Sequence, residues 1–168
     1  MTAAAIDSGL FRRVLRRHAS AVVVVTAPGP VGFTATSFAS VSLEPPLVSF
    51  SVSRAASAWP AVRSAALVAV HVLIQDQERV ARTFATRAID RFAAHAADGG
   101  SWHEGLGGVP VLDGVLAVLI CRVTNQVAAG DHVIVIASPV QAEHHDDATA
   151  TPLVYHNGAY TALDRIGP

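Results

Sequence analysis

The feature that most constrains this chain is a series of short apolar segments, each of strand length and each followed by turn residues. Ala21-Val-Val-Val-Val25 is continuous and β-branched, which predicts a strand buried on both faces. Pro28-Gly-Pro30 supplies a turn, and Val31 to Thr36 resumes as a hairpin partner. Leu47 to Val52 alternates apolar residues with serine, the pattern of a half-buried strand.

The rest of the chain continues this strand-and-turn pattern. Asn157-Gly158 is a strong hairpin signal, and Ala129-Gly130 is a second turn between apolar segments. Because strands dominate and helices are few and short, the sequence predicts a mainly β fold, a barrel with peripheral helices. The further predicted strands are Leu67 to Ile74, Val115 to Val127, Asp131 to Ala142, Leu153 to His156 and Ala159 to Leu163.

Three segments have helical patterns, and one long segment has none. Residues 9–18 place apolar side chains opposite arginines, the pattern of an amphipathic helix that Ser8 could cap. Ser57 to Ser64 predicts a short helix capped by Ser57, and residues 76–86 predict a third with Phe84 facing inward. The Gly- and His-rich stretch from His95 to Pro110 is predicted to be a loop.

Composition favours a single domain over residues 1–168, with its core from about residue 10 to 162. Apolar residues make up 51% of the 168 residues and charged residues 15%, which excludes a disordered chain. A formal net charge of −1 gives no attraction to nucleic acid or to an anionic membrane. Cys121 is the single cysteine, and no apolar run approaches the roughly 20 residues that span a bilayer. We expect a cytoplasmic protein that binds neither nucleic acid nor membrane.

Two clusters of small hydroxyl residues stand where predicted strands end, at Thr34 to Ser40 and at Ser51 to Ser57. Their small side chains would let a flat ligand approach the backbone, and their hydroxyl and N–H groups can bond carbonyl or phosphate oxygens. Arg54 is a possible counter-charge for such an anion. Ordinary strand-edge and turn residues remain the alternative interpretation, since no spacing rule singles out these serines.

Several histidines and the single cysteine are further candidates for function. His132 follows Gly130-Asp131, where it either contacts a nicotinamide or is a turn histidine bonded to the local backbone. His71 lies between valines, as a core histidine or as a cavity-lining group. His144-His145 is expected in a solvated loop and not in a metal site, because adjacent residues of an extended chain point to opposite sides. Cys121, within a buried strand, is expected to be inert.

Taken in order, the segments resemble one family. Phe11-Arg-Arg-Val-Leu15 before the strand Ala21 to Thr26 matches its opening helix and strand. Gly32-Phe-Thr-Ala-Thr-Ser-Phe-Ala-Ser-Val-Ser42 followed by Glu44-Pro-Pro46 resembles its signature G-T-A-S-F-S-V-S-P-P. Further matches are Ser51-Val-Ser53, Ser57-Ala-Trp59, Val70-His-Val-Leu73 with Gln77, Phe84-Ala85, Asp90-Arg-Phe92, Gly130-Asp-His132 and Pro152-Leu-Val-Tyr155. The chain thus resembles the flavin reductase-like family, the FMN-binding split barrels.

The resemblance implies an antiparallel split β-barrel that forms a homodimer, with flavin near the subunit interface. It implies an NAD(P)H:flavin oxidoreductase that reduces FMN, or FAD, with NADH or NADPH as donor, and that supplies reduced flavin to a partner monooxygenase. His132 would be the catalytic residue, orienting the nicotinamide and not acting as a base. The implied flavin-binding positions are Thr34, Ala35, Thr36, Ser37, Ser40, Ser51, Ser53, Ser57, Ala58, His71, Gln77, Phe84 and Tyr155.

A flavin-binding carrier or sensor without reductase turnover is the competing hypothesis. Family resemblance alone favours FMN over FAD and NADH over NADPH. The family often has asparagine where this chain has His71, a titratable group.

Overall fold

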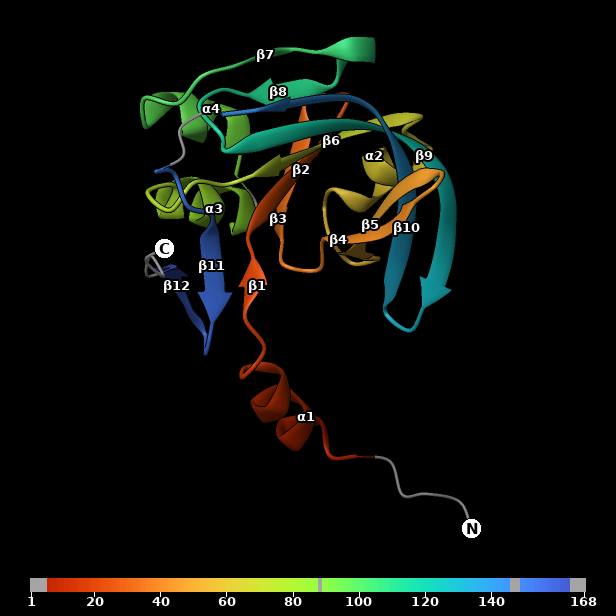
Figure 1. The fold of residues 1–168 in the computed structure, drawn as a ribbon, viewed down its shortest axis with the longest axis vertical. Helices are drawn as coiled ribbons and strands as arrows, with labels where there is room; N and C mark the ends of the chain where they lie inside the picture. The colour runs from red at the N-terminus through yellow and green to blue at the C-terminus, as the bar shows by residue number, and fades with distance from the viewer. Residues whose placement is uncertain (1–5, 88, 146–148, 164–168) are drawn as a thin grey trace.

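The computed structural model describes residues 6–87, 89–145 and 149–163 and is built around one antiparallel sheet (Figure 1). Seven strands lie in the spatial order β3-β2-β6-β9-β10-β5-β4. Every neighbouring pair in this sheet is antiparallel, which confirms the predicted mainly β fold. The bounds are β2 Val23–Ala27, β3 Val31–Ala35, β4 Ala39–Leu43, β5 Pro46–Ser53, β6 Leu67–Val72, β9 Ala117–Ala129 and β10 His132–His144.

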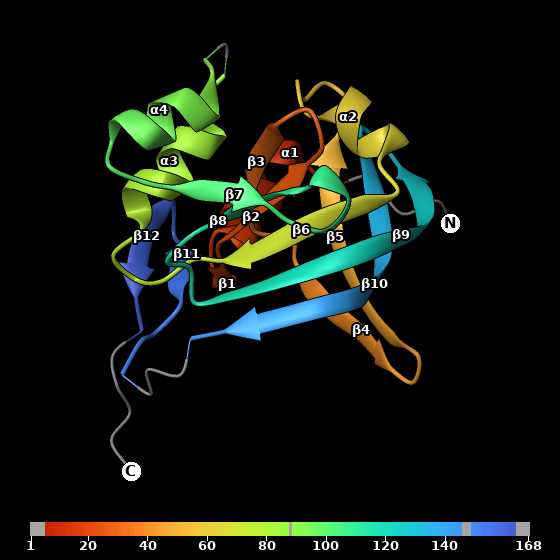
Figure 2. The same cartoon turned by 90° about the horizontal axis from the view of Figure 1, so that it is seen from above.

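The sheet curves until strands from its two ends meet. Although β3 and β5 are separated by four strands in the spatial order, the rings of Phe33 and Phe50 lie with centroids 6.2 Å apart. Figure 2, seen from above, shows β9 and β10 on the opposite side of the curved sheet from β3. The sheet therefore encloses an apolar interior, and a gap is left where β3 faces β5.

Two apolar cores lie on the two faces of the sheet. Val23 and Val25 pack in the first core with Phe50, whereas Val22 and Val24 pack in the second. Successive residues of a strand point to opposite faces, so β2 contributes to both cores and all of its residues are buried. This confirms the prediction made from the continuous valine run.

The second core is covered by helices and by two small sheets. In α3 (Glu78–Ala85), the Phe84 ring packs edge-on against Phe92 of α4 (Arg91–Ala97), with centroids 5.2 Å apart, and Phe92 packs on Trp102 in turn. The remaining elements are α1 Ser8–Leu15, β1 Ser20–Ala21, α2 Trp59–Ser64, α3 Glu78–Ala85, α4 Arg91–Ala97, β7 Trp102–Glu104, β8 Pro110–Leu112, β11 Leu153–His156 and β12 Ala159–Ala162. β1, β11 and β12 form one sheet, and β7 pairs with β8.

The predicted hairpins are confirmed by backbone geometry. Asn157 has φ 51° and Gly158 has φ 85°, the two positive values that a two-residue hairpin turn requires. Gly130 has φ 61° at the turn between β9 and β10. Gly32 serves a different need, because a Cβ there would stand 2.7 Å from Cε1 of Phe84. The absence of a side chain at Gly32 therefore lets α3 approach β3.

Three local predictions are wrong. The cap of α1 is Asp7, whose Oδ2 accepts from the Leu10 N–H at 2.8 Å, while Ser8 lies inside the helix. Ser57 does not cap α2, which follows Ala58 without a side-chain cap. The stretch from His95 to Pro110 is not a loop, since it includes the end of α4, the strand β7 and the start of β8. Buried Phe92 and His95 fix α4 there, a packing that glycine content does not reveal.

None of the helices in the described residues is long and apolar enough to cross a membrane.

Candidate functional site

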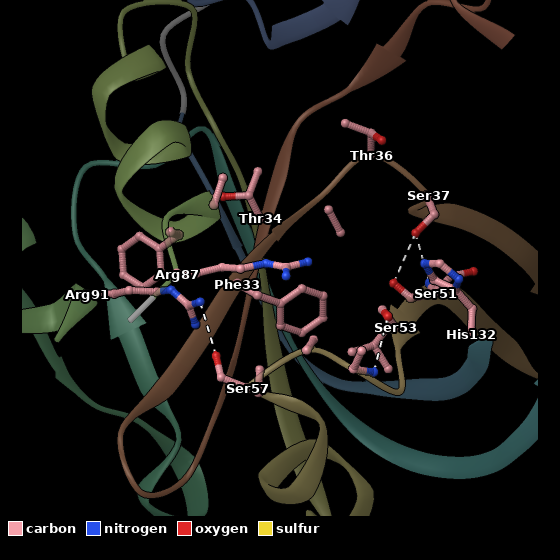
Figure 3. Close-up of a pocket in the computed structure, with 17 residues that line it drawn as sticks. Phe33, Thr34, Thr36, Ser37, Ser51, Ser53, Ser57, Arg87, Arg91 and His132 are labelled. Carbon is pink, nitrogen blue, oxygen red and sulfur yellow. Dashed lines mark hydrogen bonds between the residues drawn. The ribbon is translucent and has the colours of Figure 1, made fainter. Parts of the chain in front are cut away.

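The main cavity opens at the gap between β3 and β5 and has a volume of about 480 Å³ (Figure 3). α3 and the start of α4 form one wall, and the turn that leads from β5 to α2 forms another. Its lining consists of Phe33, Thr34, Ala35, Thr36, Ser37, Ser51, Val52, Ser53, Ala55, Ala56, Ser57, Ala58, Phe84, Ala85, Arg87, Arg91 and His132. Both predicted hydroxyl clusters therefore meet at one cavity.

The two clusters are joined by a hydrogen bond across the gap. Ser37 Oγ accepts from the backbone N–H of Ser51 at 2.8 Å, which fixes the segment after β3 against β5. Ser53 Oγ accepts from the Ala55 N–H at 3.2 Å and shapes the turn after β5. Thr34 Oγ1 donates to the carbonyl oxygen of Ala81 at 2.6 Å and so holds α3 to β3. Several of these hydroxyls thus fix the cavity wall.

One end of the cavity carries positive charge. Arg91 donates from Nε to the Thr86 carbonyl at 2.8 Å, from Nη1 to the Gly32 carbonyl at 2.7 Å and from Nη2 to Ser57 Oγ at 3.2 Å. Partial burial lowers the pKa of Arg91, yet a guanidinium stays charged at neutral pH. Figure 3 shows the Arg87 side chain reaching into the cavity beside it.

No carboxylate balances this charge within the described part of the chain. The lining contains neither aspartate nor glutamate, and the ion pairs of the described residues do not involve Arg87 or Arg91. Arg91 is held by neutral carbonyl and hydroxyl oxygens, so its charge stays available to a ligand. This end of the cavity can bind an anion such as a phosphate.

His132 lies at the opposite side of the cavity from Arg91 (Figure 3). Strand pairing brings it there, because His132 at the start of β10 is the cross-strand partner of Ser53 at the end of β5. Its Nδ1 lies 2.7 Å from Oδ1 of the exposed Asp131. That contact lowers the pKa of Asp131, through the hydrogen bond first and the charge of the imidazole second. An ionised Asp131 accepts from Nδ1–H, so Nε2 is the ring nitrogen of His132 that is left to contact a ligand.

The cavity brings together ten of the fourteen predicted site positions. They are Thr34, Ala35, Thr36, Ser37, Ser51, Ser53, Ser57, Ala58, Phe84 and His132. Their shared location agrees with a ligand site, while the contact that each makes with a flavin stays a prediction.

The other four predicted positions do not line this cavity. Ser40 is exposed on β4, and Tyr155 packs against Tyr160 of β12 with ring centroids 5.2 Å apart. Gln77 accepts at Oε1 from the Ile74 N–H and donates from Nε2 to the Gly114 carbonyl, both at 2.9 Å, so its amide supports a chain turn. It borders a separate cavity on another side of α3.

His71 is the fourth. Of the two interpretations, a core histidine or a cavity-lining group, the structure supports the core histidine. It is fully buried, with Nδ1 3.0 Å from the Val24 carbonyl oxygen and Nε2 accepting from the Leu112 N–H at 3.1 Å. Burial lowers its pKa from 6.5 to about 4. The neutral ring therefore bridges β2 and β8 inside the second core.

Sequence reasoning missed Arg87, Arg91 and Phe33. Arg91 was within the matched segment Asp90-Arg-Phe92. Its one local signal was Asp90, a helix cap that makes Arg91 the first residue of α4, but a helix start does not by itself indicate a cavity. Cys121 is buried with its pKa raised to about 12, which agrees with an inert thiol. Within the described residues no three His, Cys, Asp or Glu side chains gather in a way that could hold a metal ion.

Comparison with known proteins gives a consistent result. The family described as "Flavin reductase like domain" matches residues 15–164. The NADH:FMN oxidoreductase of Rhodococcus erythropolis is 42% identical over 167 residues, which cover 96% of this chain and 85% of the relative. The flavin-dependent monooxygenase reductase subunit HsaB of Mycobacterium tuberculosis is 32% identical over 164 residues, covering 96% and 85%.

The structural comparison agrees with the sequence matches. The Streptomyces globisporus C-1027 NADH:FAD oxidoreductase SgcE6, in complex with NAD and FAD fragments, has a TM-score of 0.84 at 32% identity. The alignment covers 99% of this chain and 98% of that one. The family match, the sequence relatives and the structural relative agree, and this chain belongs to the flavin reductase-like family.

Proposed function

We propose that this chain is an NADH:FMN oxidoreductase that reduces FMN and supplies the reduced flavin to a partner flavin-dependent monooxygenase. The observation that carries the proposal is the cavity between β3 and β5, with hydroxyl residues along it and two arginines at one end. A relative that is 42% identical is an NADH:FMN oxidoreductase, and HsaB is the reductase subunit of a monooxygenase. We assign both roles, reduction of FMN by NADH and supply of reduced flavin to a monooxygenase, to this chain.

The residues of the cavity fit FMN. A volume of about 480 Å³ is within the range of roughly 300–1,000 Å³ that is usual for small-molecule sites. FMN has a flat ring system, a hydroxylated chain and a terminal phosphate. Small residues admit the ring, serine and threonine groups match the hydroxylated chain, and the unbalanced arginines match the phosphate.

Specific roles follow from where each group lies. Arg91 and Ser57 would hold the phosphate, with Arg87 as a second cation. The segments Thr34 to Ser37 and Ser51 to Ser53 would contact the ring and the ribityl chain through backbone and hydroxyl groups. Bound flavin itself supplies the chemistry, since its ring accepts a hydride from the reduced nicotinamide. The protein supplies orientation and exclusion of water.

His132 would orient the nicotinamide and not act as an essential base. With Nδ1–H directed to Asp131, the Nε2 side of the ring would hydrogen-bond the carboxamide group of the nicotinamide. Hydride transfer requires no proton abstraction by the protein, so this contact positions the donor. NADH and NADPH share the carboxamide, and His132 does not distinguish them.

A homodimer of curved sheets, the split-barrel dimer, is also proposed. Figure 1 shows α1 projecting away from the rest of the protein, and its Leu10, Phe11, Val14 and Leu15 are 44%, 49%, 56% and 52% exposed. A helix of eight residues is marginal in water unless its apolar face is packed. A second copy of the chain that covers α1 would remove this exposure.

The reductase function is tested by mixing purified protein with each of the four flavin and nicotinamide pairs and following absorbance at 340 nm. We expect the highest kcat/KM with FMN and NADH. Supply to an oxygenase is tested by adding a flavin-dependent monooxygenase and measuring its product against reduced flavin made chemically. If neither NADH nor NADPH is oxidised with either flavin, the reductase function is contradicted. The remaining hypothesis is then a flavin-binding carrier or sensor.

A further inference from the structure

Two phenylalanines, Phe33 and Phe84, line the main cavity, and their surroundings differ. Phe84 is fully buried, and its ring packs against Phe92 and His95 with centroids 5.2 Å and 5.8 Å away. Phe33 is only half-buried, at the edge of the first core. Phe33 is therefore the phenyl ring of the described lining that still has surface to offer a ligand.

The direction of the Phe33 side chain is fixed by its two neighbours in β3. Thr34 Oγ1 donates to the Ala81 carbonyl at 2.6 Å, and the Gly32 carbonyl accepts from Arg91 at 2.7 Å. These two bonds hold the backbone on either side of Phe33. Because side chains alternate along a strand, Phe33 points to the face opposite that of Thr34, away from α3.

The buried side of the Phe33 ring is filled by apolar groups. Phe50 of β5 is fully buried, and its ring lies 6.2 Å from that of Phe33 with the two planes at 56°. Val25, the cross-strand partner of Phe33 in β2, is fully buried as well. The ring is thus supported from the first core, and its exposed surface belongs to the cavity.

Phe33 occupies the middle of the cavity. Figure 3 shows its ring between Arg91 and Ser57 on one side and Ser53 and His132 on the other. FMN with its phosphate at Arg91 and its ring system towards His132 would extend across Phe33. Aromatic rings attract each other in offset-stacked or edge-to-face contacts with centroids about 4.5–7 Å apart. A supported phenyl ring at this point suits the flat isoalloxazine ring.

We propose that Phe33 is the aromatic platform for the isoalloxazine ring, which covers one face of the flavin and leaves the opposite face to the nicotinamide at His132. The inference rests on the flavin site proposed above and adds the residue that selects the reacting face. Hydride transfer needs the two rings held against each other in a fixed orientation. A platform on one side restricts the nicotinamide to the other.

Three ligands separate a ring contact from contacts to the rest of FMN. Riboflavin lacks the phosphate, and lumiflavin has the ring system alone. Phe33→Leu keeps an apolar side chain in the gap but removes the aromatic face. We expect the Kd of FMN, riboflavin and lumiflavin, measured by calorimetry, to rise by the same factor of about three- to tenfold.

Phe33→Tyr is the conservative variant, because it keeps the aromatic face. Its Kd values should stay within about twofold of those of the unmodified protein. Tyrosine in contact with an excited flavin quenches it by electron transfer, whereas phenylalanine does not. Neither tyrosine nor tryptophan occurs in the described lining of the cavity. Phe33→Tyr should therefore shorten the fluorescence lifetime of bound FMN.

Phe38→Leu is the matched control. Phe38 is also half-buried against the first core, but it does not line the cavity. Its substitution should change the three Kd values by less than about twofold. If Phe33 only fills the gap between β3 and β5, leucine serves as well, and the two leucine variants bind all three flavins alike. That result would overturn the inference.

NMR of the unmodified protein decides if Phe33→Leu does not fold. Nuclear Overhauser effects between the Phe33 ring protons and the isoalloxazine protons of bound FMN should be present, and they should persist when NAD⁺ is added. Their absence, their loss on addition of NAD⁺, or an unchanged lifetime in Phe33→Tyr would each overturn the platform. Failure of the proposed function is distinguishable, because it is the absence of NADH oxidation by the unmodified protein with any flavin.

Discussion

Arg91 donates a hydrogen bond of 2.7 Å from Nη1 to the backbone carbonyl oxygen of Gly32. The contact ties the first residue of α4 to β3, at a glycine that also makes room for the Phe84 ring. Backbone carbonyls orient the guanidinium without neutralising it. The positive charge at this end of the cavity is therefore fixed before any ligand arrives, which lowers the cost of ordering it on binding.

Replacing Arg91 tests this arrangement. Arg91→Met should raise the Kd of FMN about ten- to a hundredfold, since a hydrogen bond to a charged group contributes roughly 1.5–3 kcal/mol. Riboflavin lacks the phosphate, so its Kd should change less than about twofold. Both constants are measured by fluorescence quenching, with the exposed Arg63→Met in α2 as the control.

The comparison with riboflavin separates the phosphate contact from a structural role. Arg91 also joins α4 to Thr86 and Gly32, and loss of those bonds would disturb the whole cavity. Equal weakening of FMN and riboflavin binding would show that Arg91 acts through the fold alone.

His132 is expected to govern the nicotinamide and not the flavin. His132→Ala should raise the KM of NADH about tenfold, the effect of losing one hydrogen bond of about 1–1.5 kcal/mol. The change in kcat should stay within about threefold, because the ring only positions the donor. Steady-state kinetics with saturating FMN measure both, with exposed His156→Ala as the control. A kcat lowered a hundredfold at unchanged KM would instead make His132 a participant in the chemical step.

Much of the fold could be predicted from local patterns, and the reasons are physical. The valine run of β2 predicts burial on both faces because only a strand covered on two sides tolerates it. Positive φ at Asn157 and Gly158 follows from their residue types. The two hydroxyl clusters were predictable as a pair only through the family resemblance, since their meeting depends on curvature of the whole sheet.

His71 and Gln77 were expected to bind the flavin, but neither lines the main cavity. A motif fixes the position of His71 and Gln77 in the chain but not the direction of their side chains. His71 bonds Val24 and Leu112 inside the second core, and Gln77 bonds the backbone at Gly114. Arg91 was missed for the converse reason, because its partner Gly32 belongs to a strand far away in the sequence.

His71 should make stability depend on pH. Its pKa falls from 6.5 to about 4 in the folded chain, because burial favours the neutral ring. A depressed histidine pKa stabilises the fold fully above pH 6.5, and this contribution is lost as the pH falls towards 4. The loss should reach about 3 kcal/mol of the free energy of unfolding, measured by urea denaturation at each pH.

His71→Asn should remove most of that dependence, while exposed His156→Asn should keep it. If His71→Asn does not fold, NMR titration of the unmodified protein decides instead. The ring resonances of His71 should titrate near pH 4, and titration near 6.5 would contradict the bridging role.

The apolar face of α1 should hold two copies of the chain together. Light scattering should give twice the 17.4 kDa of one chain, and Phe11→Glu with Val14→Glu should shift the protein towards the monomer. Two charges placed in a packed apolar contact are costly, whereas they are harmless on a helix that faces water. Arg13→Glu on the same helix is the control for charge alone. A monomer before substitution, or a dimer that survives both glutamates, would show that α1 is not the contact.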